Sequence, residues 1–224
     1  MINFNSYVPT RLLIKSLFLF IGLLVLPLVG AAQSGPGTYI LVDNRQVVYT
    51  GDLDISGLRL VSKEGKEKEK PKTVTWQASE VYWARVGQQR WLPVSNFPIP
   101  AGLGFKKVEY GLAEVLDSGR VLLLRYDYEV GGGGMGPAGF STRTMSVYLL
   151  QVPDDENALL IPMNFLSGKG TEFREMLAPH FSARPDLLQQ LEKGEVARRN
   201  LVAFVHAYNT KQPFVAKPEN AQQD

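Results

Sequence analysis

The spacing of apolar residues changes once along this chain, and that change constrains the fold more than any other feature. From residue 39 to 163, short runs rich in β-branched and aromatic residues alternate with turn residues, a pattern that predicts strands. From residue 171 to 209, apolar residues recur at helical spacing instead. We therefore predict an α+β fold, with an antiparallel β-sheet or partly open barrel of roughly eight to ten short strands followed by three C-terminal helices.

Turn signals separate the predicted strands. The expected strands cover residues 39–42, 46–50, 52–55, 58–62, 73–76, 80–86, 90–94, 105–116, 120–130, 144–152 and 158–163. Asp117, Ser118 and Gly119 form a hairpin turn signal, whereas the prolines and glycines of 96–104 favour a crossing loop. Within 120–130, an unbroken apolar half precedes an alternating half. This strand is therefore expected to be buried on both faces first, and on one face afterwards.

The helical part contains start and stop signals. Thr171 is placed to cap the first helix, and Pro185 to open the second. Lys193 and Gly194 are expected to end that second helix. The third helix, expected over 195–208, carries the clearest apolar stripe. The stripe consists of Leu201, Val202, Phe204, Val205 and Tyr208.

The first 32 residues predict export. Arg11 and Lys15 precede the apolar run 17–29, which small residues follow at 30–32; this order is typical of a secretory signal peptide. An uncleaved membrane anchor is the alternative, but the run is shorter than the roughly 20 apolar residues that a spanning helix needs. A cytosolic protein is the remaining alternative. We expect a signal peptide at 1–32, a linker at 33–38, one domain at 39–209 and a flexible tail at 210–224. The exported protein is expected in the periplasm, outside the cell or at the cell surface.

Composition narrows the function classes. The chain has 24 Lys+Arg and 22 Asp+Glu residues, and the two cations Arg11 and Lys15 lie in the predicted signal peptide. The remaining 192 residues therefore have 22 residues of each sign, which argues against a nucleic-acid partner. The chain has no cysteine, which excludes disulfides, thiol catalysis and thiolate metal sites. It has only two histidines, His180 and His206.

Three short motifs suggest chemistry but have simpler explanations. Glycines 131, 133 and 136 match G-x-G-x-x-G, yet the segment that follows is strand-like, so a hairpin loop is favoured over a dinucleotide site. Asp52 and Asp54 lie on one face of an expected strand, which fits a solvated edge better than calcium binding. His180, Ser182 and Asp186 are too close in sequence to converge readily into a triad. We therefore predict no catalytic residue, no metal site and no cofactor.

The aromatic residues of the middle strands are the best candidates for a binding surface. Tyr82 and Trp83 point to opposite faces of a strand, so one of them is expected at the surface. An exposed tryptophan beside arginines would make a stacking surface for sugars or for a partner protein. The alternative is that the rings fill the core. The candidate binding residues are Tyr82, Trp83, Arg85, Arg90 and Trp91.

Several packing motifs carry a resemblance to a known family. They are VVYTGDL at 47–53, VTWQASEVYW at 74–83, FREMLAPHF at 173–181, RPDLL at 184–188 and NLVAFVHAYN at 200–209. In these segments the chain resembles a family of uncharacterised exported proteins common in Bacteroidota. The resemblance implies export and architecture but no activity. Its Tyr208-Asn209 ending is interpreted as an aromatic anchor followed by a C-cap asparagine.

These observations predict a non-enzymatic exported domain that acts through binding or envelope structure. Its partner would be an envelope protein or a glycan, with no nucleic acid, and with membrane contact only through the uncleaved signal peptide during export. The alternative is a β-domain that binds a small molecule or glycan through Trp83 or Trp91. A third hypothesis is a carboxylate-based hydrolase that uses Asp127 or Glu109.

Overall fold

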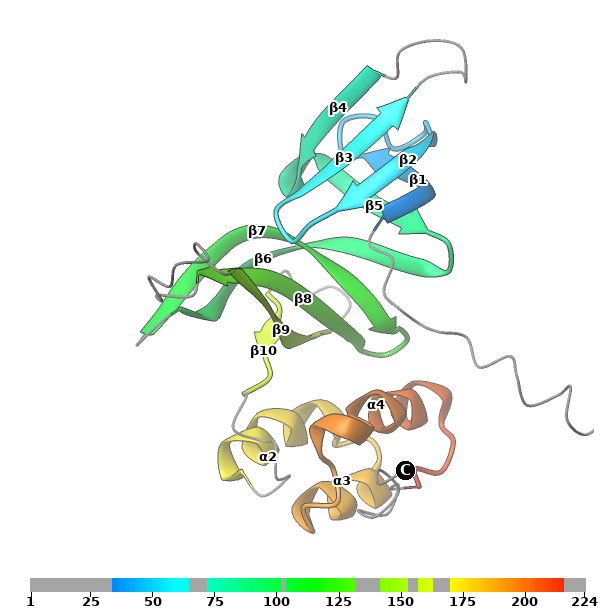
Figure 1. Ribbon diagram of the computed structural model, residues 1–224. Coiled ribbons are helices and arrows are strands. Elements are labelled where there is room, and N and C mark those ends of the chain that lie inside the picture. Colours follow the sequence, from blue (N-terminus) through cyan, green and yellow to red (C-terminus); the bar gives the residue numbers. More distant parts are fainter. Residues whose placement is uncertain are drawn as a thin grey trace, which may run out of the picture. The chain divides into compact units, whose positions relative to one another are not determined.

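A large open antiparallel sheet precedes three α-helices, which confirms the predicted α+β fold (Figure 1). The computed structural model describes residues 34–64, 72–101, 104–131, 142–152, 157–162 and 170–215. Within these residues, ten strands pair in the order β10-β9-β8-β7-β6-β5-β1-β2-β3-β4. The strands are β1 (Ser34–Leu41), β2 (Tyr49–Ile55), β3 (Arg59–Glu64), β4 (Lys72–Gln77), β5 (Val81–Val86), β6 (Gln89–Ala101), β7 (Gly104–Asp117), β8 (Leu122–Gly131), β9 (Thr142–Gln151) and β10 (Leu159–Leu160).

The sheet follows chain order except at its first strand. β1 lies between β5 and β2, and it pairs antiparallel with both. A single 3₁₀ turn, η1 (Ala78–Glu80), returns the chain from β4 to β5. The first five strands therefore fold back on themselves and enclose a cluster of apolar side chains. The cluster includes Tyr39, Leu53, Leu60, Val81 and Ala84 of these strands, together with Trp91 of β6.

Strand β8 is buried as its sequence predicts. Val121, Leu123 and Leu124, at its start, are each exposed by 2% or less. Leu123 packs with the helices, whereas Leu124 belongs to the cluster on the other side of the sheet. From Arg125 onward the residues alternate between the two faces: Tyr126 and Tyr128 are buried and Val130 is half-buried, whereas the residues between and after them are half-buried or exposed. The turn expected at residues 117–119 is also confirmed, since β7 ends at Asp117 and β8 begins at Leu122.

The crossing loop predicted at 96–104 is wrong. β6 continues to Ala101 and β7 begins at Gly104, so the described residues of this segment belong to the far end of a long hairpin. The prolines at 93, 98 and 100 are accommodated because β6 pairs with β5 only through Gln89–Trp91. The rest of β6 pairs with β7 on one side, and no described strand pairs with it on the other. Proline, which lacks a backbone donor, is tolerated on such an edge.

The helices confirm two predicted boundaries and correct others. They are α2 (Thr171–Leu177), α3 (Pro185–Glu192) and α4 (Leu201–Thr210), with 3₁₀ turns η3 (Ala178–Phe181) and η4 (Arg198–Asn200). Pro185 opens α3 and Lys193 caps its C-terminus, both as expected. Thr171 does not cap α2, because Gly170 holds that position without a side-chain bond. α4 starts later than predicted, since the Asn200 side chain accepts a hydrogen bond from the Ala197 amide and stabilises a separate turn.

The two ends of the described region are more ordered than predicted. β1 starts at Ser34, so most of the expected linker belongs to a strand. Phe214, in the expected tail, is 6% exposed and meets Phe204 edge to face with ring centroids 5.4 Å apart. Asn209 is not a C-cap, since it lies inside α4 and Lys211 adopts the left-handed conformation instead. The glycine run at 132–139 lies outside the described residues, as do the mostly charged residues 65–71.

Candidate ligand-binding groove

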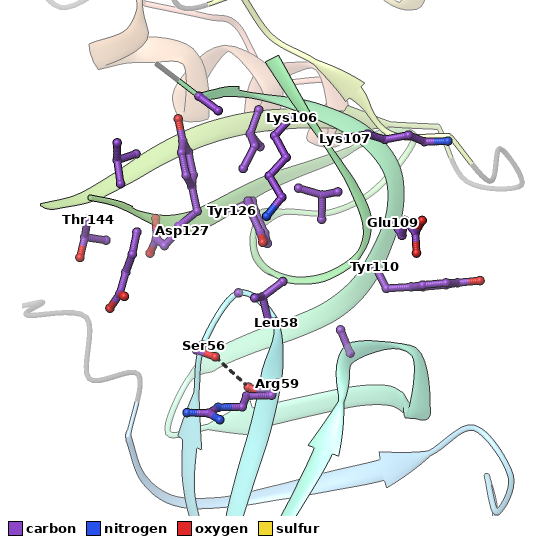
Figure 2. Close-up of a pocket in the computed structure, with 18 of the residues that line it drawn as sticks. Ser56, Leu58, Arg59, Lys106, Lys107, Glu109, Tyr110, Tyr126, Asp127 and Thr144 are labelled. Carbon is purple, nitrogen blue, oxygen red and sulfur yellow. Dashed lines mark hydrogen bonds between the residues drawn. The ribbon is translucent and has the colours of Figure 1, made fainter. Parts of the chain in front are cut away.

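The sheet divides between β7 and β8. These strands pair only at one end, where Glu114, Val115 and Asp117 face Arg125, Leu124 and Leu123. Farther along, residues 104–113 of β7 pair with β6, whereas residues 126–131 of β8 pair with β9. A groove with a volume of about 1210 Å³ lies against these diverging strands (Figure 2).

The turn between β2 and β3 lines the groove and contacts both β7 and β8. The Leu112 amide of β7 donates a hydrogen bond of 2.8 Å to the Gly57 carbonyl. A methyl group on Gly57 would collide with the backbone oxygen of Asp127 on β8 and with the Tyr126 ring. A methyl group on Gly111 would lie 2.5 Å from the same ring. Glycine is therefore required where the turn passes between the two strands.

Two tyrosines of β8 line the groove. Tyr126 is 1% exposed and meets Phe97 edge to face, with ring centroids 5.0 Å apart. Tyr128 is 8% exposed and stacks on Tyr126 at 6.2 Å. The Tyr128 hydroxyl is enclosed, and no described residue forms a hydrogen bond with it. Burial raises the pKa of Tyr126 to about 12 and raises the pKa of Tyr128 as well, so both phenols remain protonated donors at neutral pH.

The carboxylate between these tyrosines has partners within the protein. The Ser146 hydroxyl donates a hydrogen bond of 2.6 Å to Oδ1 of Asp127, and the Arg125 Nε lies 3.6 Å from Oδ2. Arg125 also forms an ion pair with Glu114. Glu109, the other carboxylate considered for hydrolysis, lines the groove and is exposed. These contacts explain how Asp127 is held on β8 by its neighbours.

The rim combines charges of both signs with exposed apolar surface. The charged lining residues are Arg59, Lys106, Lys107, Glu109, Asp127 and Glu129. Lys106 reaches into the groove toward Tyr126, whereas Lys107 points away from it (Figure 2). Leu58 and Tyr110 are 60% and 54% exposed on the lining elements β2–β3 and β7. The groove therefore suits a ligand with both polar and apolar groups and no large net charge.

The residues predicted to bind a ligand lie on β5 and β6, outside this groove. Tyr82 is 42% exposed, and the Arg45 guanidinium lies 4.5 Å from the centre of its ring. Arg85 and Arg90 are exposed cross-strand neighbours. Trp83 is half-buried. A role for these four residues in binding stays a prediction.

Trp91 differs from the other predicted residues. It is 3% exposed and packs in the cluster enclosed by the first five strands. Its partner across the strand pair is Ala84, which is also buried. Trp91 therefore stabilises the core and presents no ring surface to a ligand in this structure.

Burial of Tyr126 predicts a loss of stability in alkali. Its pKa is about 12 in the folded protein, against about 10 for an exposed tyrosine. The folded state therefore keeps a proton that the unfolded chain releases. The ionisation of Tyr126 therefore leaves the free energy of unfolding unaffected below pH about 10. Between pH about 10 and 12 the titration of this residue lowers the free energy of unfolding by about 1.4 kcal/mol per pH unit. Chemical denaturation across this range measures the free energy of unfolding against pH. Its decrease with pH should be less steep for Tyr126→Phe than for the wild type, and an equally steep decrease would contradict the prediction.

Among the residues that the structure describes, no helix is both long and apolar enough to cross a membrane. No group of three or more His, Asp or Glu side chains among them is arranged to hold a metal ion.

Comparison with known proteins adds no relative. No protein-family model, curated protein or solved structure matches this chain.

Proposed function

We propose that this protein is an exported, non-enzymatic binding domain that holds its ligand in the groove between β7 and β8. Export is supported by the signal-peptide pattern of residues 1–32. Binding is supported above all by the Tyr128 hydroxyl, which is enclosed in the groove wall and receives no hydrogen-bond partner from the described residues. A buried polar group of this kind costs about 1–3 kcal/mol. A ligand atom that forms a hydrogen bond with it would remove that cost.

The chemistry of the lining favours binding over hydrolysis. Asp127 is engaged by Ser146 and lies near Arg125, so its carboxylate serves the structure of the sheet. The phenols of Tyr126 and Tyr128 remain protonated because burial raises their pKa values. Both are therefore poor bases at neutral pH, and the Tyr128 hydroxyl is the one that would donate a hydrogen bond to a ligand.

A second candidate is a glycan or small-molecule surface around Tyr82. Its exposed ring, with Arg45 above it, is the observation that favours this alternative. Sugar rings and planar ligands stack on such aromatic surfaces. An envelope glycan or an envelope protein would be the partner in either case.

Replacing Tyr128 by phenylalanine separates a binding role from a structural one. Without ligand, Tyr128→Phe should raise the free energy of unfolding by about 1 kcal/mol, because an unsatisfied buried hydroxyl is removed. Binding should weaken about tenfold, because the ligand loses one hydrogen bond. The substitution should therefore make the free protein more stable while it weakens ligand binding, as expected for a polar group that serves function.

The probes are a glycan array and a phage-displayed library of short random peptides, each tested on the purified protein. Affinities of recovered binders are then measured for the wild type, for Tyr128→Phe and for the matched control Tyr82→Phe. Loss of affinity in Tyr128→Phe alone supports the groove. Loss in Tyr82→Phe alone would move the site to the second candidate. The absence of any binder from both probes would overturn the proposed binding function.

A further inference from the structure

The charged residues that line the groove are divided between its two sides, and this division indicates which class of ligand it accepts. Resting on the binding function proposed above, we infer that the ligand is an acidic oligosaccharide, whose carboxylate binds the ammonium group of Lys106 and whose sugar rings lie along the groove. The direction of Lys106, the placement of the lining carboxylates and the size of the groove each support it.

Lys106 directs its charge into the groove. It pairs across the β6–β7 hairpin with Ile99, which belongs to the same apolar cluster as Tyr126 and Tyr128. Residues directly opposite each other in antiparallel strands share a face of the sheet. Lys106 therefore lies on the side of these tyrosines, and its side chain reaches toward Tyr126 (Figure 2). No described residue forms an ion pair with Lys106, so its charge is available to a ligand.

The carboxylates of β8 point to the other face of that strand. Successive side chains of a strand alternate between its faces, and β8 pairs with β9 in one unbroken register. Asp127 and Glu129 therefore lie on the face opposite the two tyrosines of β8. The Ser146 hydroxyl of β9 donates a hydrogen bond to Asp127 on that face, and Arg125 lies near it. Neither carboxylate offsets the charge of Lys106 on the tyrosine side.

The remaining charged lining residues leave the tyrosine side positive. Glu109 and Lys107 both lie away from Tyr126, on the other side of β7 (Figure 2), so their opposite charges offset each other there. Arg59 lines the groove from β3 and forms no ion pair with a described residue. The lining as a whole is balanced, but the tyrosine side favours a ligand with a negative charge.

The polar contacts of this side suit one carboxylate on a sugar. A hydrogen bond from an ammonium group to a carboxylate is about twice as strong as a neutral one, so Lys106 would fix the position of the acidic group. The enclosed Tyr128 hydroxyl, for which no described residue is a hydrogen-bond partner, would donate to a sugar oxygen. A polyanion would need a cluster of cations instead, which the described residues of this side do not form.

The size and the aromatic lining of the groove favour linked sugar rings. Its volume of about 1210 Å³ exceeds the roughly 300–1,000 Å³ of sites for single small molecules, so several rings fit in a row. Tyr110 lines the groove with a ring that is 54% exposed, and sugar rings stack on such aromatic surfaces. An acidic peptide is the alternative class of ligand, and the same screen includes it.

Removing the charge from the protein and from the ligand tests this inference. A glycan array that presents uronic and sialic acid oligosaccharides beside neutral and sulfated ones should select carboxylated glycans. The tightest of them is then prepared as its methyl ester, which has no charge. Lys106→Gln should weaken binding of the acid about tenfold, because a charge-assisted contact is lost, and should leave binding of the ester nearly unchanged. Lys107→Gln is the matched control, since its side chain points away from the groove (Figure 2), and it should bind the acid as the wild type does.

Each result of this experiment has one interpretation. A loss of affinity that is confined to the acid and to Lys106→Gln supports an acidic oligosaccharide in the groove. Unchanged binding of the acid by Lys106→Gln, an equal loss for the acid and its ester, or an equal loss in Lys107→Gln would overturn the inference. Selection of neutral glycans, sulfated glycans or peptides alone would also overturn it, and if that binding depends on Tyr128 the proposed function stands. If neither the array nor the peptide library yields a binder, both fail.

Discussion

Replacing Gly57 by alanine should lower the free energy of unfolding by about 3 kcal/mol, among the largest effects expected for a single methyl group in this protein. The added carbon would collide with the Asp127 carbonyl oxygen and lie 2.8 Å from the Tyr126 ring. The first obstacle is backbone within the sheet and the second is a ring that is 1% exposed. Neither can move without disturbing β8 or the Leu112 hydrogen bond. Urea denaturation with linear extrapolation measures the loss.

Gly104→Ala is the matched control for this substitution. Gly104 also borders the hairpin of β7, but a methyl group there meets no described atom within 4 Å. Its free energy of unfolding should change by less than about 0.5 kcal/mol. Equal effects of Gly57→Ala and Gly104→Ala would show that the turn does not pack between the two strands as described.

Much of the fold could be predicted from the sequence because local patterns determine it. The alternation that begins at Arg125, the turn after Asp117 and the start of α3 at Pro185 depend on neighbouring residues, and all three are confirmed. The prediction of a crossing loop at 96–104 was wrong because the effect of proline depends on how a strand pairs with its neighbours. Prolines disfavour a central strand but fit an edge strand, and sequence alone does not show which edges remain unpaired.

The groove could not be predicted because its parts come from distant segments. Gly57, Leu112 and Asp127 meet through tertiary packing, and no local pattern marks Gly57 as more than a turn residue. Tyr126 and Tyr128 were predicted only as alternating strand residues. The aromatic residues of β5 and β6 were predicted as the binding surface instead, yet Trp91 is 3% exposed and lies in the core. Large aromatic residues pack in the interior as readily as they bind ligands.

Asn209→Ala should lower the free energy of unfolding by about 3 kcal/mol, because the asparagine side chain joins α4 to the turn between β7 and β8. Its Oδ1 accepts a hydrogen bond of 3.1 Å from the Val121 amide, and its Nδ2 donates one of 3.0 Å to the Val121 carbonyl. Nδ2 also donates a hydrogen bond of 2.6 Å to Oδ1 of Asp117. Val121 is 2% exposed, so alanine would leave its backbone groups buried without these partners.

Two further variants separate helix docking from helix capping. Thr210→Ala, at the next position, removes only an exposed hydroxyl that donates to the His206 carbonyl within the same helix. Thr210→Ala should therefore lower the free energy of unfolding by less than about 0.5 kcal/mol. If Asn209 were a helix C-cap, Asn209→Gly would be tolerated, because glycine is favoured there. If instead its side chain joins α4 to the sheet, Asn209→Gly should lower the free energy of unfolding at least as much as Asn209→Ala does. Urea denaturation of all three variants therefore decides the role of Asn209, and a stable Asn209→Gly protein would restore the capping interpretation.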